Sequence, residues 1–202
     1  MKFNIEEKFS VNSDYDTVFE FFTKPENMFP CIPGAELIKT NEDNSFEGKV
    51  KAKVGPTTLT YKGIMQYEEI NKDNGYMKLT GRGKDITGGG SAKATIESWI
   101  KQNNGQIDVI VKVEADITGR VIQFGRGMIE QIAKQMFKDF SACAKQVLES
   151  KKKVISETES KEPDNKANPA MQQKELNVIS LVLRTFASMI GEFFKKLTGK
   201  AT

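Results

Sequence analysis

The chain has 202 residues, of which 38% are hydrophobic and 28% are charged, with a net charge of +3 and no histidine. This length is enough for one sizeable domain and an appendage, and the composition is ordinary for a folded protein. The lack of histidine excludes His-based catalytic triads and His metal sites, and so small a net charge gives no argument for nucleic-acid binding.

The first segment, MKFNIEEKFSV, alternates polar and apolar side chains and includes two glutamates. It has no apolar run of signal-peptide length, so we expect no export. Residues 2–11 instead predict a strand with one buried face, because their apolar residues share one parity. Those residues are Phe3, Ile5, Phe9 and Val11.

A short helix is predicted next, with Ser13 as its N-cap and Pro25 limiting its length. The connection that follows, PENMFPCIPG, is too rich in proline for a long helix. Two interpretations of this connection stay open. It is either a tight turn whose proline and glycine set the backbone angles, or an apolar lip over a ligand cavity.

The two cysteines, Cys31 and Cys143, lie far apart in the sequence. A framework of disulfides is therefore not expected, and a reducing compartment suits two free thiols.

Six further strands are predicted between segments rich in turn formers, such as NKDNG and NNGQ. The short loops between them imply an antiparallel meander. Strands flank the glycine-rich segment GRGKDITGGGS, so we interpret it as a hairpin with room for sheet curvature rather than as a phosphate loop. The six strands are expected at residues 35–41, 45–54, 57–70, 75–87, 91–102 and 106–118.

Beyond Gly119 the apolar period becomes helical, and residues 127–149 predict one long helix that ends a domain of residues 1–149. Residues 150–174 are polar, charged and contain two prolines, which predicts a disordered linker. Residues 175–202 then predict a terminal amphipathic helix.

The order of strand, helix, six strands and long helix predicts an α+β fold. In this fold a curved antiparallel sheet of about seven strands wraps around the long helix. A sheet curved strongly around one helix does not close its core completely, so we expect an apolar cavity between the two.

Four segments carry a resemblance to a known family, namely PENMFPCIPGAELI, GKVKAKVGPTTLTYKG, LTGRGKDITGGGSAKA and ADITGRVIQFGRGMIE. Together they resemble the family of the carbon monoxide dehydrogenase G-subunit. This family lies within the START-like (SRPBCC) helix-grip superfamily of polyketide cyclases and lipid-transport proteins. The resemblance implies a non-catalytic accessory protein. It would be associated with a molybdenum hydroxylase of the carbon monoxide dehydrogenase type and tied to the inner face of the membrane.

The long helix mixes flexible methionines with small residues, which favours a ligand cavity, although its apolar stripe is also typical of a closed core. Loops held on a rigid scaffold often carry binding residues, so we also assign residues of the connection after the first helix to the cavity. The expected cavity residues are Phe29, Ile32, Pro33, Leu59, Tyr61, Met65, Met77, Leu79, Phe124, Met128, Ile129, Ile132, Met136 and Phe140.

The terminal helix carries large apolar residues on one broad face and is interrupted by Arg184 and Glu192, which a spanning helix would avoid. This favours an in-plane membrane anchor with Lys195, Lys196 and Lys200 near anionic headgroups. Docking on a partner protein or on its own domain are the alternatives. The expected anchor residues are Ile179, Val182, Leu183, Phe186, Ile190, Phe193, Phe194 and Leu197.

Three functions stay open. The first is a membrane-tethered module that binds a quinone- or lipid-like molecule and links a molybdenum hydroxylase to the inner membrane. The second is a recruitment adaptor without cargo. The third is a cyclase- or hydratase-type enzyme, which the sequence disfavours because it has no histidine and no evident acid pair.

The first function implies no catalytic residues, no cofactor and no metal site. Its partners would be an apolar small molecule or lipid, a membrane surface and a hydroxylase, but no nucleic acid. The expected location is cytoplasmic, at the periphery of the inner face of the cell membrane.

Overall fold

The computed structural model describes residues 1–159, with side chains up to residue 150. The order of one strand, a short helical region, six strands and a long helix is the order that the sequence predicts. The elements are β1 (Lys2–Val11), α1 (Tyr15–Thr23), α2 (Pro25–Met28), η1 (Phe29–Cys31), β2 (Ala35–Thr40), β3 (Ser45–Val54), β4 (Thr57–Asn71), β5 (Tyr76–Asp85), β6 (Ser91–Asn103), β7 (Gln106–Ile117), η2 (Arg120–Phe124) and α3 (Arg126–Glu159).

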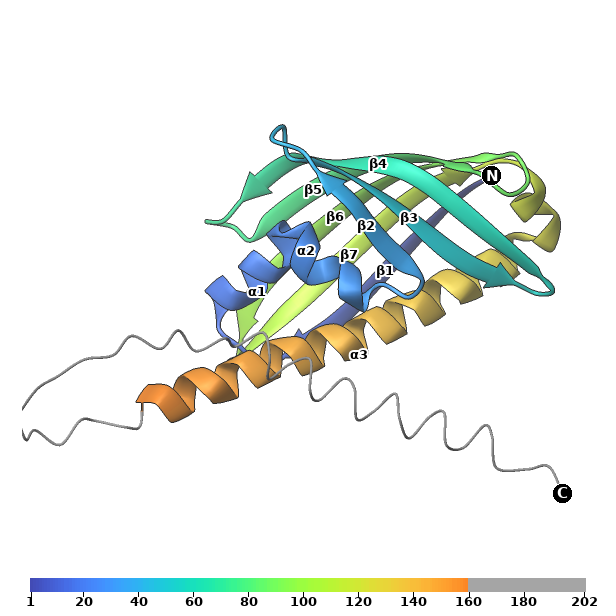
Figure 1. Cartoon of the computed structure of the whole chain (residues 1–202). Helices are drawn as coiled ribbons and strands as arrows, with labels where there is room; N and C mark the ends of the chain where they lie inside the picture. Colours follow the sequence, from blue (N-terminus) through green and yellow to red (C-terminus); the bar gives the residue numbers. More distant parts are fainter. Residues whose placement is uncertain (160–202) are drawn as a thin grey trace, which may run out of the picture. The chain divides into compact units, whose positions relative to one another are not determined.

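The strands form one seven-stranded antiparallel sheet in the order β1-β7-β6-β5-β4-β3-β2. Strands β2 to β7 are each paired with their neighbours in the sequence, and β1 joins the edge of β7. The sheet curves around α3, and α1 and α2 lie between sheet and helix at one end (Figure 1). This arrangement confirms the predicted α+β helix-grip fold.

Side chains alternate between an inner face, toward α3, and an outer face. In β1, Phe3 and Phe9 are buried on the inner face. Lys8 of the same strand points outward and forms an ion pair with Asp108 of β7, at 2.7 Å. Because neighbouring strands are in register, this alternation continues across the sheet, and its phase shifts by one residue at two β-bulges, after Leu37 in β2 and after Tyr67 in β4.

The N-cap of α1 is Asp14 and not Ser13, so the sequence prediction was wrong by one residue. The Asp14 carboxylate accepts a hydrogen bond from the Thr17 backbone N–H at 2.8 Å. The Ser13 hydroxyl is buried and donates instead to the Leu148 carbonyl of α3, at 3.4 Å. The Ser13 side chain, which local spacing assigns to the N-cap, thus makes a tertiary contact with α3 instead.

Helix α3 continues to Glu159, ten residues beyond the end expected from the sequence. The added segment is rich in lysine and glutamate, which favour helix, and the next proline is Pro163. The first part of the predicted linker is therefore helical. The remainder of that linker and the terminal helix at 175–202 lie outside the described residues.

Cys31 and Cys143 form a disulfide, which contradicts the expectation of two free thiols. Their Cα atoms are 5.3 Å apart although 112 residues separate them in the sequence. The fold places η1 against α3, and sequence distance carries no information about this approach. Because disulfides persist mainly in oxidising environments, the bond removes the argument from free thiols to a reducing compartment.

The buried hydrophobic side chains fall into two clusters. The α1-end cluster includes Phe21 and Leu148, which are both 0% exposed. The η2-end cluster lies beneath η2 and the first turns of α3, and includes Leu59 and Val121. A stretch of the inner face with small side chains separates the two clusters.

Candidate ligand cavity

Small residues line the inner face of four adjacent strands between the two clusters. One row across β3, β4, β5 and β6 consists, in register, of Gly48, Gly63, Gly83 and Ala92. In the next row, Gly81 of β5 lies opposite Ala94 of β6. Since these residues have at most a methyl group, the sheet contributes little volume here.

Close approaches explain two of the glycines. A Cβ atom at Gly63 would lie 2.3 Å from the Arg82 carbonyl oxygen of the neighbouring strand. A Cβ atom at Gly48 would lie 2.7 Å from the ring of Phe29, which packs over that strand. Gly63 therefore allows β5 to approach β4 closely, and Gly48 allows the Phe29 ring of η1 to pack on β3, both at the edge of the cavity.

The small residues form the floor of a cavity of about 320 Å³. Phe29 and Ile32, from the segment between α2 and β2, and Met136, from α3, form its walls. Ile132 and Met136 are only half-buried although they lie on the sheet-facing side of the helix. The volume falls in the range of about 300–1,000 Å³ that is usual for small-molecule sites.

The lining is almost wholly apolar on the inside. Lys49 and Arg82 contribute to it from strand positions whose side chains point outward. Tyr61 supplies the single side-chain hydroxyl among the lining residues. Within the described part of the chain this hydroxyl has no hydrogen-bond partner. Burial raises the pKa of Tyr61, and the nearby Asp85 carboxylate adds to the effect.

Asp85 lies directly opposite Tyr61 in the register of β4 and β5. Its carboxylate accepts hydrogen bonds from the Thr87 N–H at 2.9 Å and the Thr87 hydroxyl at 2.5 Å. The bond from the Thr87 hydroxyl is the main cause that lowers the pKa of Asp85. A tyrosine with a raised pKa beside a carboxylate with a lowered one is poorly suited to acid–base catalysis near neutral pH.

Five of the residues that the sequence assigns to the cavity line it, from three different parts of the fold. They are Phe29, Ile32, Tyr61, Met65 and Met136. The connection after the first helix thus does more than turn the chain. It places two apolar side chains at the cavity, while Cys31 between them is bonded to α3.

Nine predicted residues lie elsewhere, because the interior on both sides of the cavity is filled. Met77, Leu79 and Phe140 belong to the α1-end cluster or pack on it. Leu59, Ile129, Phe124 and Ile132 do the same at the η2-end cluster. Pro33 is half-buried outside the lining, and Met128 is 42% exposed on the first turn of α3.

The floor of the cavity was missed by sequence reasoning that looked for large apolar side chains. The signal that could have found it is glycine or alanine repeated with period two on the inward parity. The missed residues on that parity are Gly48, Gly63, Gly81, Gly83, Ala92 and Ala94, with Ala35, Phe46, Val50 and Ile96 beside them.

Within residues 1–159, no group of His, Cys, Asp and Glu side chains is arranged to hold a metal ion. None of the helices in the same part of the chain combines the length and the apolar character that a membrane span requires.

The fold is that of START-like proteins. A conserved protein from Geobacillus kaustophilus is similar with a TM-score of 0.62 and 19% identity, over 72% of this chain and 95% of that chain. The ZhuI aromatase/cyclase from Streptomyces sp. R1128 has a TM-score of 0.53 and 10% identity, over 74% and 94%. A START superfamily protein from Mycobacterium smegmatis has a TM-score of 0.50 and 11% identity, over 73% and 97%.

The family follows from the sequence itself. Residues 8–149, more than half of the chain, match the family model that describes the G-subunit of carbon monoxide dehydrogenase (CoxG). The chain belongs to this family, as the resemblance of its motifs indicates. Among curated proteins, no match to the chain was found.

Proposed function

We propose that the chain is a non-catalytic accessory protein that binds an apolar small molecule, quinone- or lipid-like, between the sheet and α3. The observation that carries this proposal is the apolar cavity, whose floor is built from small residues on four strands. A protein that needed only a stable core would gain free energy by filling such a space, because each buried methylene group contributes about 0.8 kcal/mol.

The size and polarity of the cavity restrict the classes of ligand that would fit it. A volume of about 320 Å³ suits a ring or headgroup and leaves a long chain to extend past the half-buried side chains of α3. The hydroxyl of Tyr61, which has no partner among the described residues, offers a hydrogen bond to one polar atom of the ligand. A quinone-like ring, with carbonyl oxygens on an apolar body, has this combination.

Membership of the CoxG family supports a link to a molybdenum hydroxylase of the carbon monoxide dehydrogenase type. We further propose that the terminal residues, with their apolar face from Ile179 to Leu197, hold the protein at the inner face of the cell membrane. A lipid-soluble ligand would then pass between the bilayer and the cavity. Liposome flotation of the full chain against one ending at Glu159, the last residue of α3, tests this anchor, and equal flotation of both would rule it out.

Organic extraction of the purified full chain, followed by mass spectrometry, tests the ligand. We expect a quinone or isoprenoid lipid at near-stoichiometric amount in the wild type, and its loss in Ala94→Phe, which fills the cavity from its floor. The control is Thr95→Phe, on the same strand but the outer face, which should retain the ligand. Repeated extraction without lipid, together with no uptake from liposomes, would leave a recruitment adaptor without cargo.

A further inference from the structure

The outer face of the sheet has two halves that differ in charge. Over β1, β7 and the distal part of β6, opposite charges are paired. Lys8 lies 2.7 Å from Asp108, and Lys112 lies 3.4 Å from Glu6. This half is therefore close to electrically neutral.

The other half, over β3 to β6, is strongly basic. Its outward positions include Glu47, Glu68, Lys78 and a set of six further lysines and one arginine. We call this set of seven cations the basic face: Lys49, Lys51, Lys53, Lys62, Arg82, Lys84 and Lys93. Among the described residues, the structure gives this set one ion pair, between Lys49 and Glu36 at 2.7 Å. All except Lys49 are exposed.

The register places like charges directly opposite each other on this face. Lys62 of β4 lies between Lys49 of β3 and Lys84 of β5, and Arg82 of β5 lies opposite Lys93 of β6. Like charges in opposite positions of an antiparallel pair destabilise a sheet. The free protein therefore carries a repulsion that an anionic surface laid against these strands would relieve.

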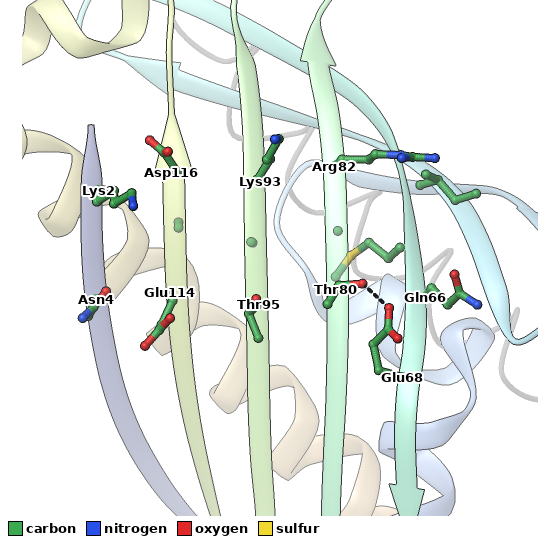
Figure 2. Close-up of a pocket in the computed structure, with 15 residues that line it drawn as sticks. Lys2, Asn4, Gln66, Glu68, Thr80, Arg82, Lys93, Thr95, Glu114 and Asp116 are labelled. Carbon is green, nitrogen blue, oxygen red and sulfur yellow. Dashed lines mark hydrogen bonds between the residues drawn. The ribbon is translucent and has the colours of Figure 1, made fainter.

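The border between the halves forms a shallow hollow of about 590 Å³ (Figure 2). Arg82 and Lys93 lie in one row with Asp116, while Thr80 and Glu114 lie in the next (Figure 2). The carboxylates of Glu114 and Asp116 on β7 and of Glu68 on β4 line this hollow, so they border the excess positive charge of the basic face.

We propose that the basic face binds an anionic phospholipid surface. Lysine is depleted at protein–protein interfaces, whose centres favour aromatic residues. The outward positions opposite Lys53, Lys51 and Arg82 on β4 hold Thr58, Thr60 and Ile64. The outward aromatic pair, Tyr76 and Trp99, lies at the α1 end of β5 and β6. Clusters of lysine attract anionic bilayers by about 1 kcal/mol for each residue near the surface. Ile86, two residues beyond Lys84, is 63% exposed, and an apolar side chain beside cations is typical of interfacial binding.

This contact deepens the proposed membrane association but does not depend on the terminal helix, because it rests on folded residues of the sheet. It would hold the domain with the outer face of the strands that form the cavity floor against the lipid headgroups. A partner with an acidic protein surface is the competing occupant, and the test below separates the two.

The test is flotation of the full chain with vesicles of phosphatidylcholine alone and with vesicles that also contain phosphatidylglycerol. The variant is Lys62→Gln/Lys84→Gln, which keeps the stems and removes two charges. We expect its partition into the anionic vesicles to fall by about fivefold for each lysine, or about 25-fold in all. Its partition into phosphatidylcholine vesicles, which reports the terminal residues, should not change.

The matched control is Lys134→Gln/Lys138→Gln, which removes two exposed charges from α3. An equal loss in both variants would mean that net charge alone matters and would overturn the proposal. Unchanged partition in the basic-face variant would overturn it as well and would leave an acidic protein as the occupant. If nothing binds phosphatidylcholine but the basic face still controls binding to anionic vesicles, the anchor fails and this proposal stands.

Discussion

The α1-end cluster and the middle of the sheet bury the same inner face by different means. At the α1 end, Phe9 and Phe21 interleave with Phe140 of α3, with ring centroids about 6.5 Å apart. In the middle, glycine and alanine face the helix and a cavity remains. One continuous sheet can therefore form a packed core over part of its length and leave a cavity over the next part.

The two regions should respond very differently to truncation of a large side chain. Phe21→Ala removes a ring that is 0% exposed, and should lower the free energy of unfolding by about 3–5 kcal/mol. Met136→Ala enlarges the existing cavity between the sheet and α3, and should lower the free energy of unfolding by about 1 kcal/mol or less. Chemical denaturation measures both values. Equal losses would mean that the cavity wall is packed as tightly as the core.

The disulfide joins the two regions, since Cys31 belongs to the α1-end cluster and its neighbours Phe29 and Ile32 line the cavity. Closing a loop between residues 112 apart restricts the unfolded chain. Reduction should therefore lower the free energy of unfolding by about 2–5 kcal/mol.

Denaturation with and without a thiol reductant measures this loss. A Cys31→Ser/Cys143→Ser variant serves as the control and should not respond to the reductant. Wild-type protein whose stability is the same in both conditions would show that the two cysteines contribute nothing as a bridge.

The strands and the two faces of the sheet could be predicted from the sequence, because alternation with period two is a local property. The odd-numbered apolar residues from Ile107 to Ile117 face inward, as their parity predicts. The cavity was predicted only in part, because its floor is marked in the sequence by glycine and alanine and not by large apolar residues. The disulfide and the Ser13 contact with α3 depend on segments more than 100 residues apart, which no local pattern reports.

The charged network at the α1 end of β7 makes this region sensitive to acid. Hydrogen bonds from Lys8, Ser10 and Asn103 lower the pKa of Asp108 to about 2. The folded-state pKa therefore lies below the unfolded value. The stability that Asp108 contributes is fully present above about pH 4 and is lost as the pH falls toward 2.

Denaturant midpoints measured between about pH 5 and pH 2 should fall for the wild type and fall less for Asp108→Asn. Glu42→Gln, in the exposed β2–β3 turn, is the control and should follow the wild type. If Asp108→Asn has the same acid profile as the wild type, the network does not contribute to folding stability.

Two tyrosines on the inner face of β4 differ in the same way as the two regions, because one hydroxyl is hydrogen-bonded in the packed cluster and the other faces the cavity. The hydroxyl of Tyr67, in the α1-end cluster, donates to the Phe22 carbonyl at 2.5 Å. Burial is the main cause that raises the pKa of Tyr67. Tyr61, six positions earlier, faces the cavity, and within the described residues its hydroxyl has no partner.

Replacing each tyrosine by phenylalanine should therefore have opposite consequences. Tyr67→Phe leaves the Phe22 carbonyl without its donor and should lower the free energy of unfolding by about 1–3 kcal/mol, with ligand affinity unchanged. Tyr61→Phe should leave stability unchanged and weaken binding of a quinone-like probe by about tenfold, the value of one hydrogen bond. Fluorescence titration with a short-chain naphthoquinone, and with the naphthalene that lacks its carbonyl oxygens, measures the difference. Only the naphthoquinone should respond to Tyr61→Phe, because only its oxygens can accept the bond. A tenfold loss for both probes would assign Tyr61 a role in shape alone and remove the polar contact from the site.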